Sequence, residues 1–401
     1  MSAAPGAKGL IWALGVTQII GYGTLYYSFA ILAPAIARDV ALLLDALFGL
    51  LSLALVCGGL AAPKAGGLAD RFGAGRLMVP GSLAAGLALV AAAFAPDALT
   101  LFLSLVAMEV ASAFVLYGTA FAAIVQATGQ HAQRSITHLT LIAGFASTLF
   151  WPLTAALHAR LSWQDVYLVF AVLNLAVCLP IHLWVARLPR EIATSEAKGD
   201  AAPPSGPDGD GLRPAARSLF PLMLAALAIE GLVLAAILVH MVPLVTALGL
   251  GTSGLVVSTF FGPAQVASRL VNMLFGGRLA QRHLAIIAAG LLPLGLALLL
   301  STAPQLAGVG AFAILFGLGS GLTSIVGGTL PLELYGRNGY GARLGWVSAA
   351  RQFSAAFAPF AFAVALERWG AATALSTALA FGLAALGLFV LLARAAGAVR
   401  V

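Results

Sequence analysis

The stretch GGLADRFGAGRLM, residues 66–78, separates two long apolar runs of the chain, 41–62 and 78–96. Each run has about the 20 apolar residues that a helix needs to cross the hydrocarbon core of a bilayer. The stretch between them is polar, basic and rich in glycine, which allows the backbone to turn tightly. We therefore expect a short loop on one side of a membrane.

The composition extends this interpretation to the whole chain. Hydrophobic residues make up 61% and charged residues 9% of its 401 residues, whereas an average soluble domain has about 25% charged residues. In lipid every backbone polar group must be bonded internally, which favours helices, and the alternating ten-residue pattern of a membrane β-barrel is absent. The sequence predicts twelve transmembrane helices, near 10–36, 41–62, 78–96, 99–121, 136–158, 165–186, 219–244, 253–275, 283–302, 306–331, 345–366 and 370–394.

Lysines and arginines are distributed unevenly about these helices. With the N-terminus placed in the cytoplasm, only Arg38, Arg160 and Arg368 of the 21 fall outside, and Arg269 and Arg351 fall within helices. Because basic residues favour the cytoplasmic side, we expect an integral protein of a bacterial cytoplasmic (inner) membrane with both termini in the cytoplasm. The net charge of +7 then reflects topology and requires no nucleic-acid partner.

One long polar stretch divides the chain. It covers 188–217, is rich in Pro, Gly, Asp and Ser, and is expected to be a cytoplasmic linker. It separates an N-terminal six-helix bundle, 1–187, from a C-terminal one, 218–401. GGLADR (66–71) follows the second helix and GRLAQR (277–282) follows the eighth. Repeated parallel halves are typical of one transporter architecture, although such short strings can also recur by chance in a biased composition.

The 66–78 stretch resembles the loop signature of the major facilitator superfamily, Gly-x-Leu-Ala-Asp-Arg-x-Gly followed by basic residues. Ala74 and Gly75 depart from that signature, and Gln281 stands in the second copy where Asp70 stands in the first. The resemblance implies an all-α polytopic fold of two pseudo-symmetric six-helix bundles. It also implies secondary active transport by alternating access. The matching residues are Gly66, Leu68, Asp70, Arg71, Gly73, Arg76 and Leu77.

The resemblance further implies that Asp70 holds the outward-open state shut on its inner face. A carboxylate can cap a helix N-terminus or pair with a cation, and such contacts break in the other conformation. The alternative is a basic loop that only sets topology. We expect the gating motif to comprise Gly66, Asp70, Arg71, Gly73, Arg76, Gly277 and Arg282.

Acidic residues occur inside two predicted helices that the resemblance places around the central cavity. Glu109 lies near the middle of helix 4 and Glu230 near the middle of helix 7, with His240 near the outer end of helix 7. Ionisable residues within a membrane are functional candidates, because burying them is costly. We expect proton coupling through these three residues. The alternative is that each glutamate pairs with an arginine or a hydroxyl inside the bundle, and that His240 bonds only to backbone.

Basic and aromatic residues supply a candidate substrate site. Arg269 offers a bidentate fork for a carboxylate, and Tyr22 and Tyr26 lie one turn apart on helix 1. The set loosely resembles the monocarboxylate and oxalate/formate branch of the superfamily, in which a helix-8 arginine binds the carboxylate. Gln265 replaces an aspartate of animal members, and Arg351 stands for a helix-11 lysine. Arg351 could instead extend toward the membrane surface.

These patterns favour a monomeric, proton-coupled transporter of a small organic anion, with the solute, protons and the lipid bilayer as partners. Proton-driven efflux of drugs or other toxic compounds is the first alternative, and a non-transporting receptor is the second. No enzyme motif such as HExxH is present. Cys57 and Cys178 have no metal-site spacing, so we expect no metal, cofactor or disulfide framework.

Overall fold

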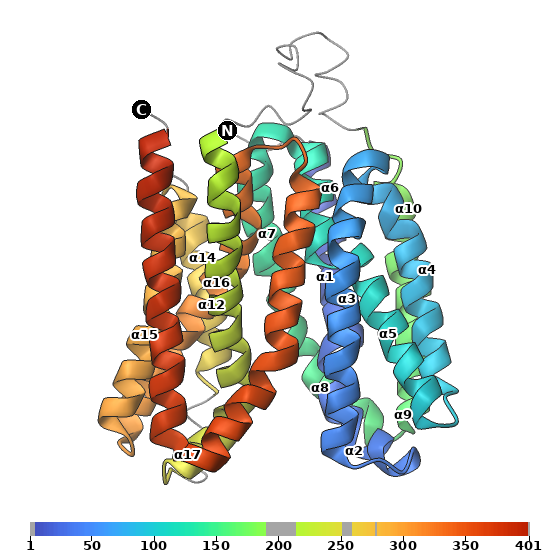
Figure 1. Ribbon diagram of the computed structural model, residues 1–401. Coiled ribbons are helices and arrows are strands. Elements are labelled where there is room, and N and C mark those ends of the chain that lie inside the picture. Colours follow the sequence, from blue (N-terminus) through green and yellow to red (C-terminus); the bar gives the residue numbers. More distant parts are fainter. Residues whose placement is uncertain (1–4, 190–213, 251–258, 277–278, 400–401) are drawn as a thin grey trace. The chain divides into compact units, whose positions relative to one another are not determined.

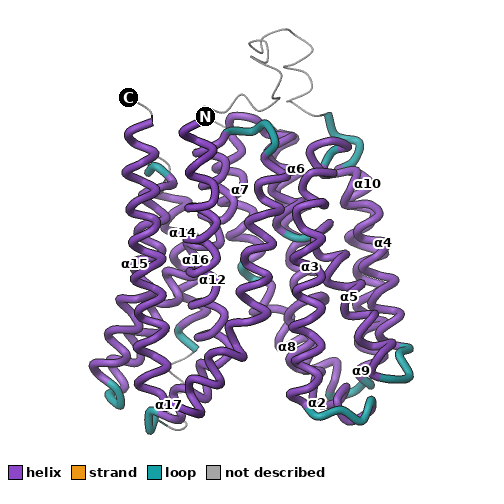
Figure 2. Tube along the Cα trace, viewed as in Figure 1, coloured by secondary structure: helices purple, strands orange, loops and turns teal. Residues whose placement is uncertain are grey.

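The computed structural model describes residues 5–189, 214–250, 259–276 and 279–399. Helices account for nearly all of them, and no strand occurs in these ranges (Figure 2). The helices form two compact units. Unit 1 contains the described chain up to 189 together with Arg337–Gln352, and unit 2 contains the remainder. Most of the predicted linker, 190–213, lies outside the described residues.

Unit 1 is a bundle of helices with short connections (Figure 1). Two of its segments are π-helices, η1 and η3, and each continues the helix before it. Leu32, Leu47, Leu89 and Phe170 are buried together in its core. The elements are α1 (Pro5–Tyr22), η1 (Gly23–Tyr27), α2 (Ser28–Asp39), α3 (Leu44–Phe72), α4 (Ala74–Ala93), α5 (Ala98–Val115), α6 (Tyr117–Thr128), η2 (Gly129–His131), α7 (Ala132–Ala143), α8 (Ala146–His158), α9 (Trp163–Leu173), η3 (Asn174–Cys178) and α10 (Leu179–Val185).

Unit 2 is built around α16, which packs against α14 and α15. Its core includes Val233, Leu296, Phe312 and Phe316. α17 turns sharply at Gly370, whose φ of 81° is a left-handed conformation that glycine adopts readily (Figure 1). The elements are α12 (Pro214–Ala247), α14 (Phe261–Phe275), α15 (Gln281–Thr302), α16 (Leu306–Tyr335) and α17 (Tyr340–Val399), of which the first turns belong to unit 1.

The prediction of a polytopic all-α membrane protein is confirmed. Nine helical runs of the described chain are long and apolar enough to cross a membrane. Ala98–His158 and Tyr340–Ala398, with 61 and 59 residues, each contain two predicted segments. α14 has only 15 residues, because the predicted eighth segment begins outside the described chain. The runs and α14 together accommodate the twelve predicted segments.

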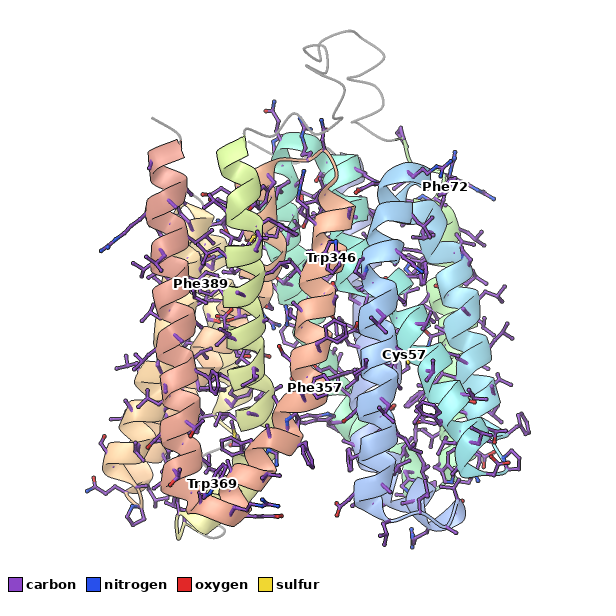
Figure 3. The ribbon with its side chains drawn as sticks, viewed as in Figure 1. Cys57, Phe72, Trp346, Phe357, Trp369 and Phe389 are labelled. Carbon is purple, nitrogen blue, oxygen red and sulfur yellow. The ribbon has the colours of Figure 1, made fainter. Side chains whose placement is uncertain are left out.

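Exposed side chains fit a hydrocarbon surrounding. Among the residues labelled in Figure 3, Phe357 and Trp369 are 61% and 63% exposed, whereas Phe389 is buried. Exposed leucine, phenylalanine and tryptophan side chains recur along most of the long helices. Such extensive apolar exposure is unfavourable in water and is expected of a surface that contacts lipid.

The prediction of a loop over the 66–78 stretch was wrong for most of it. α3 continues as a helix to Phe72, and α4 begins at Ala74. Leu68, Ala69 and Arg71 are good helix formers, and α3 has 29 residues, more than the hydrocarbon core requires. Only Gly73 turns the chain, with φ of 98°. The signature therefore lies on the last turns of one helix and the first turn of the next.

Candidate functional site

Asp70, near the end of α3, caps the start of α17. Its Oδ1 accepts the backbone N–H of Gly341 and its Oδ2 accepts that of Ala342, each at 2.8 Å. The first-turn N–H groups of a helix lack partners within the helix, and all three residues belong to unit 1. The carboxylate thus lies at the positive end of the α17 dipole.

Backbone packs directly against backbone beside this cap. A Cβ on Gly66 would collide with the carbonyl group of Gly341, and a Cβ on Gly345 would collide with that of Ala62. Small residues permit such close approach of helices in membranes. Gly66 therefore serves a close contact, and the turn is made by Gly73.

No contact with α17 is described for the basic residues of the predicted gating motif. The Arg71 guanidinium lies over the Phe72 ring, 5.0 Å from its centroid. Arg76 lies in the first turn of α4, and Arg282 lies in the first turn of α15. Gly277 lies outside the described residues. The structure therefore brings Asp70 and Gly66 to α17 and leaves Arg71 stacked on its neighbour.

Gln126 of α6 also holds this region, and the sequence analysis missed it. Its Nε2 donates to the Ala69 carbonyl at 2.9 Å, and its Oε1 accepts the Ala74 N–H at 3.0 Å. Gln126 thus clamps the end of α3 to the start of α4. In unit 2, the Glu333 carboxylate accepts the backbone N–H of Gln281, which begins α15. In the sequence, Gln126 and Glu333 each stand near the end of a long apolar segment, and this position was the signal that could have identified them.

Tyrosines of α1, η1 and α6 gather with Trp151 in unit 1. Ring centroids of Tyr22 and Tyr117 are 4.7 Å apart, those of Tyr22 and Tyr26 are 6.5 Å apart, and those of Tyr26 and Tyr27 are 5.3 Å apart. Trp151 lies 6.0 Å from Tyr27. We call Tyr22, Tyr26, Tyr27, Tyr117 and Trp151 the aromatic cluster. The sequence pointed only to Tyr22 and Tyr26.

The π-helical turn that carries Tyr26 and Tyr27 is fixed by a buried bond. Asn174, the first residue of η3, donates from Nδ2 to the Thr24 hydroxyl and to the Phe170 carbonyl, both at 2.9 Å. Thr24 and Asn174 are both buried. The two π-helices of unit 1 are therefore linked side by side, and π-helical turns occur frequently at functional sites.

Glu109 of α5 and Arg351 of α17 adjoin the aromatic cluster within unit 1. The Gln352 amide and Glu109 both lie against Gly58, since a Cβ there would be 3.1 Å from Gln352 Nε2 and 3.1 Å from Glu109 Cβ. Ser348, three residues before Arg351 on α17, lies 3.1 Å from the Cβ position of Gly118, which follows Tyr117 of the aromatic cluster. The predicted residues Tyr22, Tyr26, Glu109 and Arg351 are thus brought together.

Gln265 and Arg269 of α14 both bond to α16 in unit 2. Gln265 Nε2 donates to the Ser320 hydroxyl at 2.9 Å. Arg269 Nε donates to the Ser324 hydroxyl at 3.1 Å and to the Gly321 carbonyl at 3.4 Å. Arg269 is buried, so these bonds fix the plane of its guanidinium.

Glu230 of α12 bonds to the same helix. Glu230 is 1% exposed, and its Oε1 lies 2.8 Å from the Thr323 hydroxyl. The Thr323 hydroxyl also lies 2.9 Å from the Gly319 carbonyl. Its single hydrogen therefore has two possible acceptors. This arrangement corresponds to the alternative of a glutamate that pairs with a hydroxyl inside the bundle.

His240 lies further along α12. Its Nδ1 is 3.0 Å from the Ala236 carbonyl oxygen, and its ring centroid is 5.2 Å from that of Phe362. Of the predicted proton-coupling residues, His240 and Glu230 thus belong to unit 2 and Glu109 belongs to unit 1.

Comparison with solved structures supports the same fold. The chain is similar to the human organic anion transporter MFSD10 (TETRAN), with a TM-score of 0.73 and 13% identity over 96% of this chain and 100% of that one. It is also similar to the transporter FucP in its outward conformation, with a TM-score of 0.70 and 13% identity over 95% and 98% of the two chains. The proton:xylose symporter XylE gives a TM-score of 0.68 at 13% identity over 94% and 95%.

Sequence comparison gives the family directly. No curated protein sequence matches the chain. The sequence model of the Major Facilitator Superfamily, however, matches residues 14–359, which is most of its length. With the helical fold and the Asp70 cap, this match leads to one conclusion. The chain is a member of the major facilitator superfamily of membrane transporters.

Proposed function

We propose that the chain is a secondary active transporter of a bacterial cytoplasmic membrane, with cytoplasmic termini. It moves a small organic anion by alternating access and is coupled to protons. One observation carries the proposal: each unit holds a glutamate and an arginine within its predicted transmembrane segments, Glu109 with Arg351 and Glu230 with Arg269. An ionised side chain at mid-bilayer costs about 2.5–3.5 kcal/mol even on insertion scales, so four such residues are expected only where they serve function.

The arginines are assigned to the carboxylate of the substrate. Arg269 is oriented by Ser324 and Gly321, and an oriented guanidinium matches the bidentate geometry of a carboxylate. Arg351 adjoins the aromatic cluster, whose rings provide apolar surface and hydroxyl groups for the rest of a small solute. Tyr22, Tyr26 and Gln265 complete the assignment.

The two glutamates are assigned different roles. Within the described chain the Glu109 carboxylate makes no hydrogen bond, so its proton can be exchanged without breaking a protein contact. When it carries a proton, Glu230 can donate to Thr323 while Thr323 donates to Gly319, so the proton is held by a protein contact. We therefore assign proton coupling to Glu109 and a structural role to Glu230, with His240 as a subsidiary candidate.

The Asp70 cap is assigned to the inner gate of the outward-open state. Opening the inner face requires α17 to leave α3, which breaks two charge-assisted bonds and the glycine contacts at once. Contacts that exist in one state and break in the other bias such an equilibrium. Gln126 keeps the α3–α4 corner intact while this happens.

Two of the similar solved structures support this proposal in part. MFSD10 is described as an organic anion transporter and XylE as a proton symporter. At 13% identity these likenesses support the fold, and substrate and coupling are carried by the residues discussed above.

The test is transport by the purified full-length chain in proteoliposomes. A panel of radiolabelled small carboxylates is offered with an imposed pH gradient, with a dissipated gradient and with an uncoupler. We expect at least one carboxylate to move against its own gradient only when the pH gradient is present. If no carboxylate moves and cationic drugs are expelled instead, the drug-efflux alternative holds. If nothing moves although ligands bind, the receptor alternative holds.

A further inference from the structure

Two ionisable residues of unit 1, Glu109 and Arg351, meet near the aromatic cluster. Glu109 packs at Gly58 beside Gln352, which is the neighbour of Arg351 on α17. Ser348, Arg351 and Gln352 share one face of α17, since they are three and four residues apart. Ser348 Oγ lies 3.1 Å from the Cβ position of Gly118, next to Tyr117, and Gln352 lies at Gly58 with Glu109. The face of α17 that carries Arg351 is therefore directed toward both Tyr117 and Glu109.

The Glu109 carboxyl group and the Arg351 guanidinium do not pair directly. In the described part of unit 1 no ion pair joins the Glu109 carboxylate to the Arg351 guanidinium. Ionised groups inside a membrane usually pair with each other, because an unpaired ion is costly there. Arg351, and Glu109 once it has lost its proton, can therefore each bind the opposite charge of a ligand that carries both signs.

The aromatic cluster supplies the surface that such a ligand needs. Tyr26 and Trp151 are 48% and 54% exposed, so protein covers only part of each side chain. Tyrosine and tryptophan faces attract ammonium groups through the ring quadrupole. A simple carboxylate would use Arg351 and the apolar surface of the rings, but it carries no positive charge for the ring faces or for Glu109.

Building on the proposed function, we propose that the substrate is a zwitterion of the amino-acid type. Its carboxylate binds Arg351, and its ammonium group binds the aromatic cluster beside Glu109. This specifies the carboxylate of the proposed function: it also carries an ammonium group, so the substrate has no net charge near neutral pH.

Proton exchange follows from this arrangement. An ammonium group beside Glu109 favours the ionised carboxylate, so substrate and proton compete for the same residue. One proton leaves Glu109 for the solvent as one zwitterion binds, and no other bond is made or broken. Transport of this kind is an exchange of substrate for a proton. A simple carboxylate would instead bind while Glu109 keeps its proton.

The test uses three probes with one skeleton, measured by isothermal titration calorimetry on the full-length chain in nanodiscs. The probes are phenylalanine, 3-phenylpropanoate and 2-phenylethylammonium. We expect phenylalanine to bind about tenfold tighter than either single-charge probe, or ~1.4 kcal/mol. Titrations in two buffers of different ionisation enthalpy should show release of about one proton per phenylalanine bound, as one-for-one competition at Glu109 requires.

Two variants locate the charges. Glu109→Gln should abolish proton release and reduce phenylalanine binding to the level of 3-phenylpropanoate. Arg351→Gln should weaken phenylalanine and 3-phenylpropanoate alike and leave 2-phenylethylammonium unchanged. Glu367→Gln is the matched control, since Glu367 is exposed and lies far along α17 from Arg351, and it should leave all three isotherms unchanged. Thermal unfolding of each variant checks that it is folded.

The outcomes separate this inference from the proposed function. Equal binding of phenylalanine and 3-phenylpropanoate, or phenylalanine binding without proton release, would overturn the zwitterion assignment and leave carboxylate transport standing. Preference for 2-phenylethylammonium, or binding of none of the three, would overturn it as well. The absence of any gradient-driven carboxylate movement in proteoliposomes would contradict the proposed function itself.

Discussion

The Asp70 carboxylate accepts the backbone N–H of Gly341 at 2.8 Å, across 271 residues of sequence. The neighbouring Ala342 N–H donates to the other oxygen at the same distance. The cap depends on both a negative charge on α3 and a start of α17 that can approach without a Cβ at Gly341. A Cβ there would lie 2.6 Å from Asp70 Oδ1. Charge and shape can therefore be tested separately.

Replacing Asp70 with asparagine tests the charge. Asparagine offers one acceptor oxygen, so one of the two bonds to α17 is lost and the other becomes a neutral bond. A hydrogen bond to a charged group contributes about 1.5–3 kcal/mol, which corresponds to a shift of roughly tenfold or more between conformations. We expect transport in proteoliposomes to fall at least about tenfold while the thermal unfolding temperature changes little. An unchanged transport rate would contradict the gating role.

Replacing Gly345 with alanine tests the shape. The added methyl group collides with the Ala62 carbonyl, so α17 cannot approach α3 although Asp70 is intact. We expect the loss of transport seen with Asp70→Asn, with substrate binding retained. The matched control is Gly387→Ala, in the same helix, where a Cβ meets nothing within 4 Å. Glycine costs about 0.5–1 kcal/mol relative to alanine in a helix interior, so the control should transport normally and be slightly more stable.

Sequence patterns predicted the parts of this protein that depend on local chemistry. Apolar segment length predicted the spanning helices, and the spacing of Gly66, Asp70 and Gly73 predicted the motif. The end of α3 was misplaced, because a composition that ends a hydrophobic run does not end a helix. Gln126 and Tyr117 were missed, because their roles depend on which helices pack together. The hydroxyl partner of Glu230 was foreseen as a chemical type, but Thr323 itself was not.

The buried bond between Asn174 and Thr24 can be tested by removing either partner. Thr24→Val keeps the shape and leaves the Asn174 N–H without that acceptor, which costs about 1–3 kcal/mol in a buried site. We expect thermal unfolding to shift down by several degrees. Because the π-helical turn carries Tyr26 and Tyr27, the KM for substrate should also rise. Combining Thr24→Val with Asn174→Leu removes both polar groups and should recover part of the stability. Additive losses would show that the two residues act independently.

Asp97, which lies outside the membrane-spanning segments, should make the stability of the fold depend on pH. It caps α5, and the bonds that it accepts from the Thr100 backbone N–H and hydroxyl lower its pKa below the ordinary value. A depressed pKa stabilises the fold above the unfolded value of about 3.9, and this contribution is lost as pH falls through the folded pKa. Asp97→Asn keeps a capping oxygen that does not titrate. The unfolding temperature of the variant should therefore decline less between pH 6 and pH 3, and identical profiles would contradict the assignment.

The last prediction separates the two intramembrane glutamates. Glu109→Gln removes an acid that makes no hydrogen bond within the described chain, so the variant should bind substrate but lose accumulation driven by a pH gradient. Glu230→Gln places an amide donor where a protonated carboxyl group would donate to Thr323, and Thr323 can still donate to Gly319. This second variant should accumulate substrate within about twofold of the parent, since a change of less than about 0.4 kcal/mol is expected for a preserved network. Uptake with and without an imposed gradient is measured in proteoliposomes, with Glu367→Gln as the control. If Glu230→Gln abolishes accumulation and Glu109→Gln does not, the two roles are reversed. The coupling proton is then carried by Glu230, where α12 contacts Thr323 of α16.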